Sequence, residues 1–250
     1  MIKIECLSCF YGRYHAVKNI SATFNDGEIT AVIGPNGCGK STLLSACCGQ
    51  IVSTSGEILI NNTLITEMSR TEIAQNVALL PQFRLVPDIT VETLVLHGRF
   101  PWIGYPRIYS NEDREIAKQA MKRLGIHEKS NLLLSLLSGG ERQRAYIAML
   151  LTQNTQNIIL DEPATYLDIV HQLELEKILV ELKKEGKCIV TVMHNIGNAI
   201  EFADKIAVMT NGRLLALGTP QEIIKSNAIE QAFNVSIKKR EQYDFFLNTY

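Results

Sequence analysis

The sequence has no apolar segment long enough to cross a membrane. Its longest apolar run covers only residues 145–151, whereas a helix that spans a bilayer needs roughly 20 residues. The first residues, 1–7, alternate in polarity and lack the apolar core of a signal peptide. We therefore expect the mature chain to begin at Met1 and to stay in the cytoplasm.

The sequence also lacks a strong net charge. Its 25 Lys and Arg residues are matched by 26 Asp and Glu residues, which leaves a formal charge of -1. No global field attracts the chain to nucleic acid, so any anion site must be local. Apolar residues make up 46% and charged residues 20%, an ordinary globular composition that excludes disorder and coiled coils.

Disulfides are not needed, because a chain of 250 residues can bury about 70–75% of its unfolded surface. Cys6 and Cys9 form a CxxC pair that could in principle hold zinc. A zinc site needs four ligands, however, and no second pair follows at a suitable spacing. We expect the six cysteines to be small packing residues in a reducing compartment.

Strand-like segments alternate with helix-like segments over most of the chain, which predicts an α/β fold with a mainly parallel sheet. The opening differs: short apolar segments at 2–7, 20–24 and 29–33, separated by polar turns, predict a small antiparallel sheet. Residues 85–152 read as consecutive helices and predict an inserted α-helical subdomain. The rest, residues 1–84 and 153–250, then forms the core and the antiparallel β-subdomain of a single domain.

Local signals fix several element boundaries. Three helix starts carry a capping residue followed three positions later by an acid. They are Ser69 with Glu72, Ser110 with Asp113, and Thr219 with Glu222. Asn211-Gly212 between two apolar segments predicts a two-residue hairpin.

A phosphate-binding loop follows the apolar segment 30–33 and precedes a helical run. It matches GxxxxGK[ST] and consists of Gly34, Pro35, Asn36, Gly37, Cys38, Gly39, Lys40 and Ser41, with Thr42 next in the helix. Glycines let backbone N–H groups surround a phosphate, and the helix N-terminus adds positive potential. Lys40 is expected to reach the β- and γ-phosphates, and Ser41 to offer its hydroxyl to Mg²⁺.

A second motif supplies carboxylates. The apolar segment 158–160 ends in Asp161 and Glu162, as in a Walker B motif. Asp161 is expected to hold Mg²⁺ through water, and Glu162 to polarise the attacking water. A solvated strand end is the alternative, and the phosphate-binding loop upstream argues against it.

The segment 137–144 decides the family. Its Leu137-Ser138-Gly139-Gly140-Glu141 resembles the LSGGQ signature of ATP-binding cassette (ABC) ATPases, with Glu141 in place of the usual Gln. The resemblance implies that Ser138, Gly139 and Gly140 bind the nucleotide. Ser138 also suits the N-cap of a helix, whose N-terminus attracts an anion.

Other landmarks of the ABC family occur in the expected order. Tyr11 resembles the A-loop aromatic that stacks on adenine, although Phe10 and Tyr14 are nearby alternatives. Gln82 resembles the Q-loop glutamine that contacts Mg²⁺ and water. Asp168 resembles the D-loop aspartate, and His194 resembles the switch histidine at the γ-phosphate. The other four histidines, His15, His97, His127 and His171, match no catalytic position.

The resemblance implies an ATPase that works with ATP and Mg²⁺ as a homodimer. In such proteins the phosphate-binding loop of one copy faces the signature of the other copy, so a monomer holds no complete site. The expected partners are membrane permease subunits and, indirectly, a substrate-binding protein. The expected location is the cytoplasmic face of the inner membrane.

Segments 97–101 and 166–172 resemble ATPases that serve importers of iron-siderophore, haem or cobalamin-type metal chelates. A soluble single-cassette ATPase that remodels a cytoplasmic complex is the alternative. A P-loop kinase is excluded, because it has no use for the signature and D-loop. Nothing indicates binding to nucleic acid.

Three further features have two interpretations each. Cys38 lies near Lys40 at a helix N-terminus, where its pKa should fall and its reactivity rise, or it is merely tolerated there. Residues 83–87 form either a permease-docking groove or internal packing. The tail 238–250 mixes basic and aromatic residues and is expected to be a surface tail that packs a few rings, with a binding role as the alternative.

Overall fold

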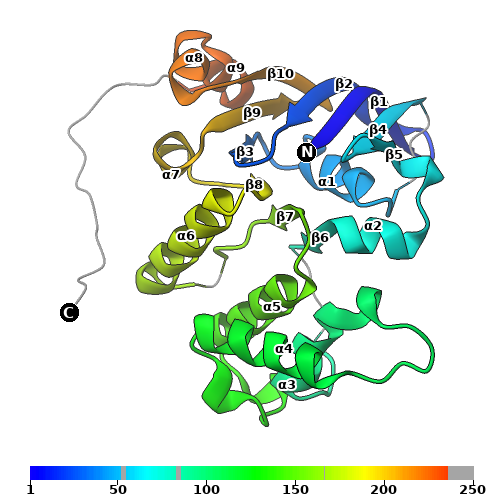
Figure 1. Cartoon of the computed structure of the whole chain (residues 1–250). Coiled ribbons are helices and arrows are strands. Elements are labelled where there is room, and N and C mark those ends of the chain that lie inside the picture. The colour runs from blue at the N-terminus through cyan, green and yellow to red at the C-terminus, as the bar shows by residue number, and fades with distance from the viewer. Residues whose placement is uncertain (52–54, 83–85, 166, 236–250) are drawn as a thin grey trace.

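Two sheets form the centre of the molecule (Figure 1). The computed structural model describes residues 1–51, 55–82, 86–165 and 167–235. The antiparallel sheet has the order β2-β1-β4-β5, with β1 at Ile2–Tyr11, β2 at Tyr14–Phe24, β4 at Ser55–Ile60 and β5 at Thr63–Leu64. The second sheet has the order β10-β9-β3-β8-β7-β6, with β3 at Ile29–Ile33, β6 at Val77–Leu80, β7 at Asn157–Asp161, β8 at Cys188–Val192, β9 at Lys205–Thr210 and β10 at Arg213–Gly218.

The second sheet is mainly parallel, as the sequence predicts. β3, β6, β7, β8 and β9 pair in parallel, and only β10 runs antiparallel to its neighbour β9. Every residue of β3, β7 and β8 is buried, because both faces of the sheet are covered. The predicted α/β fold with an N-terminal antiparallel sheet and a helical insert is confirmed.

The predicted place of β3 is wrong. The sequence assigns Ile29–Ile33 to the antiparallel sheet, but this strand lies between β8 and β9 and is parallel to both. Its composition explains the difference, because Thr30 is its one polar residue and all five residues are buried. A strand of a half-exposed antiparallel sheet would alternate in polarity. β4 and β5 complete the antiparallel sheet instead, and β1 and β2 extend to Tyr11 and Tyr14 at the tip of their hairpin.

The helices occupy two regions. Around the sheets lie α1 (Lys40–Cys47), α2 (Arg70–Asn76), α6 (Ile169–Lys184), α7 (Ile196–Phe202), α8 (Pro220–Lys225), α9 (Ala228–Phe233) and the 3₁₀ turn η1 (Ile65–Glu67). The helical region contains α3 (Val91–Leu96), α4 (Asn111–Arg123), α5 (Gly139–Gln153) and the 3₁₀ turns η2 (His97–Trp102), η3 (His127–Lys129) and η4 (Leu134–Leu136). Figure 1 shows α3, α4 and α5 gathered on the side of β6 and β7.

The helical region matches the predicted run of helices. Its described residues contain no strand apart from an isolated bridge between Thr90 and Leu133. The exact division at 84–85 stays a prediction, because it falls partly outside the described residues. At the other end, the Gln153 side chain donates to the carbonyl oxygens of Ala74 and Val77, at 2.6 and 3.2 Å. The last residue of α5 is thus bound to the start of edge strand β6.

The predicted helix starts and hairpin are confirmed. Ser69, Ser110 and Thr219 each accept a hydrogen bond from the backbone N–H of the acid three positions on, in complete capping boxes. Asn211 and Gly212 connect β9 to β10 with φ angles of 48° and 80°. Both angles are positive, as a tight two-residue hairpin of this kind requires.

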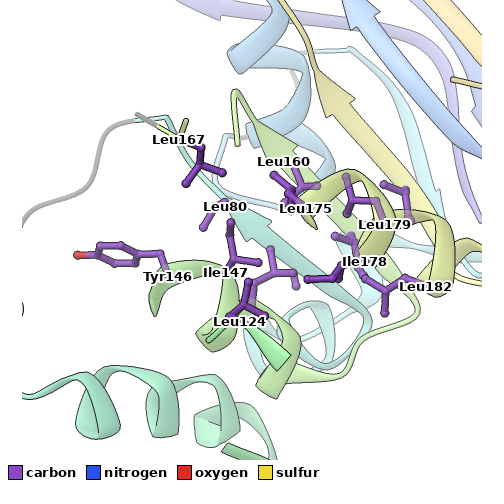
Figure 2. Packing of buried hydrophobic residues seen from close by; sticks show 14 of the residues in the cluster. Leu80, Leu124, Tyr146, Ile147, Leu160, Leu167, Leu175, Ile178, Leu179 and Leu182 are labelled. Atoms are coloured by element: carbon purple, nitrogen blue, oxygen red, sulfur yellow. The ribbon is translucent and has the colours of Figure 1, made fainter. Parts of the chain in front are cut away.

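The core has two parts, one on each face of the mainly parallel sheet. One part lies against the antiparallel sheet and α1, with Phe24, Leu43 and Leu44 buried. The other joins the sheet to α5 and α6, and Figure 2 shows Leu80, Leu160, Ile147, Leu175 and Leu179 converging there. Among the described residues, no helix combines the length and apolarity that a membrane crossing requires.

Candidate functional site

The phosphate-binding loop connects the buried strand β3 to α1. The N-cap of α1 is Gly39, whose φ of 104° suits glycine, and an added Cβ would lie 2.5 Å from the carbonyl oxygen of Ala16. The Lys40 ammonium donates to the carbonyl oxygens of Gly34 and Pro35, at 2.7 and 3.0 Å. The lysine is nearly buried, so its charge lies within the loop rather than in solvent.

Most of the predicted site residues line one cleft of about 520 Å³. Its lining consists of Tyr11, Tyr14, Ala16, Asn36, Gly37, Gly39, Lys40, Ser41, Thr42, Gln82, Glu162 and His194. These residues come from the β1–β2 hairpin, from the loop before α1 and the first turn of α1, and from the segments that follow β6, β7 and β8. Parallel strands end at the same edge of the sheet, which is where ligands bind in open α/β folds.

The two carboxylates after β7 have different surroundings. Asp161 is buried, and Ser41 hydrogen-bonds to its side chain. Glu162 faces the cleft, and its Oε1 atom lies 2.5 Å from Nε2 of His194. The Glu162 backbone has a φ of 54°, a left-handed conformation that costs of order 1–3 kcal/mol for such a residue. The fold thus holds this carboxylate in a strained turn beside an imidazole.

The surroundings of Asp161 suit a divalent cation. Burial raises the pKa of Asp161, the hydrogen bond from Ser41 counteracts part of this rise, and the Glu162 charge adds to it. Its Oδ1 atom is buried and has no hydrogen-bond partner among the residues that the structure describes. A cation beside Oδ1 would supply the missing partner and favour the ionised carboxylate. Ser41, Asp161 and Gln82 provide the oxygen atoms that Mg²⁺ prefers.

The prediction that Cys38 has a lowered pKa is wrong. Its side chain is only 6% exposed, and this burial raises the pKa of the thiol. The charge of Lys40 and backbone N–H groups oppose the rise without overcoming it. The sequence shows the helix N-terminus and the lysine, but it does not show that the thiol points into the core.

The aromatic residues of the hairpin separate into two groups. Tyr11 and Tyr14 both line the cleft and are 53% and 61% exposed. Phe10 instead stacks on His15, with ring centroids 3.9 Å apart. Tyr14 is therefore a cleft residue that the sequence offers only as an alternative, and its place follows from its pairing with Tyr11 across the hairpin.

The signature residues lie outside this cleft. Ser138 caps α5, with Gly139 and Gly140 in its first turn. Asp168 caps α6 by accepting from the backbone N–H of His171 at 2.9 Å. None of these four residues lines the cleft that contains Lys40. In one copy of the described chain, the predicted nucleotide-binding residues therefore lie on two separate surfaces.

Side-chain contacts around the D-loop were not visible in the sequence. The His171 ring bonds Asp168 through Nδ1 and Arg144 of α5 through Nε2. This histidine matches no catalytic position, and it instead connects α5 to the start of α6. The signal was the i,i+3 spacing from the capping residue Asp168.

Three other predictions have limited or no structural test. Cys6 is exposed and Cys9 is buried, and the described residues contain no cluster of His, Cys, Asp or Glu suited to a metal. Of the predicted docking segment, residues 83–85 lie outside the described residues, and Val86 is 44% exposed. The tail 236–250 also lies outside the described residues, as does Tyr166.

Known proteins resemble this chain over nearly its full length. The family description "ABC transporter" matches residues 17–165. The ferric enterobactin transport ATP-binding protein FepC of Escherichia coli (strain K12) is 38% identical, over 92% of this chain and 86% of that protein. The iron(3+)-hydroxamate import ATP-binding protein FhuC of Bacillus subtilis (strain 168) is 38% identical, over 94% and 88%.

The fold has solved counterparts as well. The dimeric structure of a bacterial ABC transporter cassette aligns with a TM-score of 0.79 and 28% identity, over 88% of this chain and 99% of that one. The phosphate-binding loop, the paired carboxylates and the signature residues all lie within residues 17–165, which match the family. The chain belongs to the ABC transporter family, as one of its ATP-binding and ATP-hydrolysing subunits.

Proposed function

We propose that the chain hydrolyses ATP at two composite sites formed by a homodimer. The observation that carries this proposal is the separation of the cleft around Lys40 from the signature residues at the start of α5. Each ATP would contact the loop of one copy and Ser138 and Gly140 of the other. The dimeric state of the related bacterial cassette supports the arrangement.

Different residues are assigned to the phosphates, to the adenine base and to the dimer-facing side of the site. The residues expected to surround the phosphates are Gly34, Pro35, Asn36, Gly37, Cys38, Gly39, Lys40, Ser41 and Thr42. Backbone N–H groups and the Lys40 ammonium attract the phosphate oxygens. Tyr11, with Tyr14 beside it, offers a ring for the adenine base. Asp168 and Gly139 are assigned to the dimer-facing side of the site.

Hydrolysis depends on the residues that follow β6, β7 and β8. Glu162 accepts a hydrogen bond from the attacking water and polarises it, while His194 orients the Glu162 carboxylate and reaches the γ-phosphate. Gln82 would face the water from the end of β6. Ser41, Asp161 and Gln82 would hold Mg²⁺, which would supply the positive charge that phosphoryl transfer requires.

Glu162→Gln tests the composite site. We expect ATP hydrolysis to fall about 10²- to 10⁴-fold, because the general base is lost, and the variant to form a stable ATP-bound dimer. Steady-state ATPase assays and size-exclusion chromatography with and without Mg-ATP measure both effects. Glu201→Gln, which removes an exposed carboxylate on α7, is the matched control. An unchanged ATPase rate in Glu162→Gln would remove this residue from its role.

We further propose that the dimer powers an importer of iron-siderophore, haem or cobalamin-type metal chelates from the cytoplasmic face of the inner membrane. Relatives named for ferric enterobactin and iron(3+)-hydroxamate support this cargo class over the remodelling of a soluble complex. Uptake of labelled ferric siderophore by a deletion strain tests it: the wild-type gene should restore uptake and Lys40→Ala should not. A soluble partner in a pull-down from solubilised membranes would instead favour remodelling.

A groove beside the helical region offers a place for the permease. It encloses about 500 Å³ and is lined by the ends of α1 and α5, by α2 and by β6, including Gln50, Ile73, Leu79 and Gln153. β6 leads directly to Gln82, so a permease helix in this groove would contact the strand that positions a nucleotide-site residue. Ile73→Asp should abolish binding to the permease and leave ATP binding by the isolated subunit intact.

A further inference from the structure

Glu141 has an unusual position at the start of the signature helix. It stands where the family signature has an uncharged glutamine, in the first turn of α5. One carboxylate oxygen, Oε2, accepts from the backbone N–H of Ser138 at 2.8 Å, and Oε1 bonds the ammonium of Lys129. The backbone N–H of Glu141 in turn donates to Ser138 Oγ at 3.3 Å. Glu141 therefore holds the serine that is proposed to contact the partner's ATP.

A carboxylate at this place creates an electrostatic problem. In the proposed dimer, the N-terminus of α5 must approach a terminal phosphate, and a negative charge three residues from Ser138 repels that anion. Glu141 is 20% exposed, so water screens its charge only in part. The ammonium of Lys129 is the cation that contacts it.

The fold fixes the position of Lys129. It ends the 3₁₀ turn η3, and its backbone N–H donates to the carbonyl oxygen of Ile126 at 3.1 Å. Ile126 is fully buried among the helices of this region. The backbone of Lys129 is thus anchored to the same packed unit as α5, and only its side chain must be ordered to reach Glu141.

We propose that Lys129 is a positioning residue of the signature surface: it neutralises and orients Glu141, so that Ser138 and Gly140 can accept the terminal phosphate bound by the other copy. The inference rests on the proposed composite site. It assigns no contact between Lys129 and the nucleotide. Its effect belongs to closure of the dimer, because the described lining of the cleft around Lys40 includes no residue of α5 from the same copy.

The experiment uses the full-length Glu162→Gln protein as background and measures the ATP concentration that gives half-maximal dimer. We expect Lys129→Met to raise this concentration about five- to tenfold at low salt, the size of one uncompensated charge near a protein surface. Adding Glu141→Gln to Lys129→Met should return it to within about twofold. Lys129→Arg, which keeps the charge, should behave like the background.

Two controls separate an electrostatic role from a structural one. Arg123→Met breaks the ion pair by which α4 of the helical region contacts Glu181 of α6, and should leave dimerisation unchanged. The loss in Lys129→Met should shrink in about 1 M salt, where charges are screened beyond roughly 3 Å. Nucleotide binding by the monomer, measured with a fluorescent ATP analogue, should stay the same in every variant, which also shows that each variant is folded.

The outcomes are distinguishable. A shift below about twofold in Lys129→Met, a loss that persists when Glu141→Gln is added, or a loss insensitive to salt overturns the role of Lys129. If the Glu162→Gln background itself forms no dimer at any ATP concentration, the composite site fails and the role of Lys129 fails with it. If the Glu162→Gln background and its Lys129→Met variant dimerise at the same ATP concentration, the composite site stands and only the proposed role of Lys129 is wrong.

Discussion

At the scale of single residues, Glu162 and His194 are the pair on which we propose that hydrolysis depends. Their side chains are 2.5 Å apart, and the positive φ of Glu162 aims its carboxylate into the cleft. We expect His194→Ala to lower kcat about 10²-fold while KM for ATP changes little, because the histidine acts on the water-polarising group. Steady-state kinetics measure both constants. A variant with full kcat would show that the pair is not used in turnover.

Cys38 should be slow to react although it lies in the phosphate-binding loop. Burial raises the pKa of its thiol, and the side chain is only 6% exposed. We expect iodoacetamide at neutral pH to label Cys38 roughly tenfold or more slowly than the exposed Cys6, with or without ATP. Mass spectrometry of peptides after timed labelling gives both rates. Rapid, ATP-protected labelling of Cys38 would contradict the burial argument.

Ionised Glu141 should contribute to the stability of the fold, and this contribution should be lost at acid pH. The hydrogen bond from Lys129, with those from Ser138, lowers the pKa of Glu141 from 4.5 to about 2. A depressed pKa means that the ionised form stabilises the fold, fully above pH 4.5 and progressively less as the pH falls toward 2.

Urea unfolding of wild type and Glu141→Gln at several pH values tests this sensitivity. The wild type should be the more stable protein at pH 6, and the difference between the two should shrink below pH 4.5. Other carboxylates titrate in both proteins and cancel. A difference that does not depend on pH would show that the charge of Glu141 is irrelevant to stability.

At the scale of helices and strands, the sequence predicted where three helices begin but not the sheet to which β3 belongs. Ser69, Ser110 and Thr219 begin helices because the residues that satisfy the first N–H groups are local in sequence. β3 was assigned to the wrong sheet because its partners, β8 and β9, lie more than 150 residues away. The nearly continuous apolar sequence of this strand, in which Thr30 is the one polar residue, is what indicates the parallel sheet.

Gly98 permits the close packing of η2 against α5. A Cβ on this residue would overlap the carbonyl oxygen of Met149 and crowd Gln153 and Thr152. We expect Gly98→Ala to destabilise the protein by about 1–3 kcal/mol, the range for overpacking a close contact. Gly104→Ala is the matched control, because a Cβ there meets nothing within 4 Å. Equal urea midpoints for the two variants would contradict the close approach.

At the scale of the whole molecule, the sequence predicted which residues act together but not how they are arranged. Walker motifs identified Lys40, Ser41, Asp161 and Glu162 because each motif is a short local pattern. Side-chain burial and pairing, which decide the state of Cys38 and the contacts of Glu141, depend on segments that meet only after folding.

ATP binding should stabilise the whole chain. A ligand at about 100 times its Kd adds roughly 2.7 kcal/mol, which corresponds to a rise in Tm of about 5–10 °C for a protein of this size. Lys40→Ala should lose most of this rise, because the ammonium no longer attracts the phosphates. Thermal scans of each protein with and without Mg-ATP measure the shift against its own baseline. If Mg-ATP raised the Tm of Lys40→Ala as much as that of the wild type, the nucleotide would have to bind outside the cleft around Lys40.

The hydrogen bond from Gln153 to edge strand β6 holds the C-terminal end of α5, so a rotation about this end would move the N-terminal end of the helix most. The helix carries Ser138 at one end and is pinned at the other to the strand that leads to Gln82. At 1.5 Å per residue its 15 residues span about 22 Å. A tilt of about 10° around the pinned end sweeps the far end through about 4 Å, more than the length of a hydrogen bond. In the proposed dimer, a small displacement of β6 beside Gln153 would therefore be enough to bring Ser138 into or out of contact with the partner's phosphate.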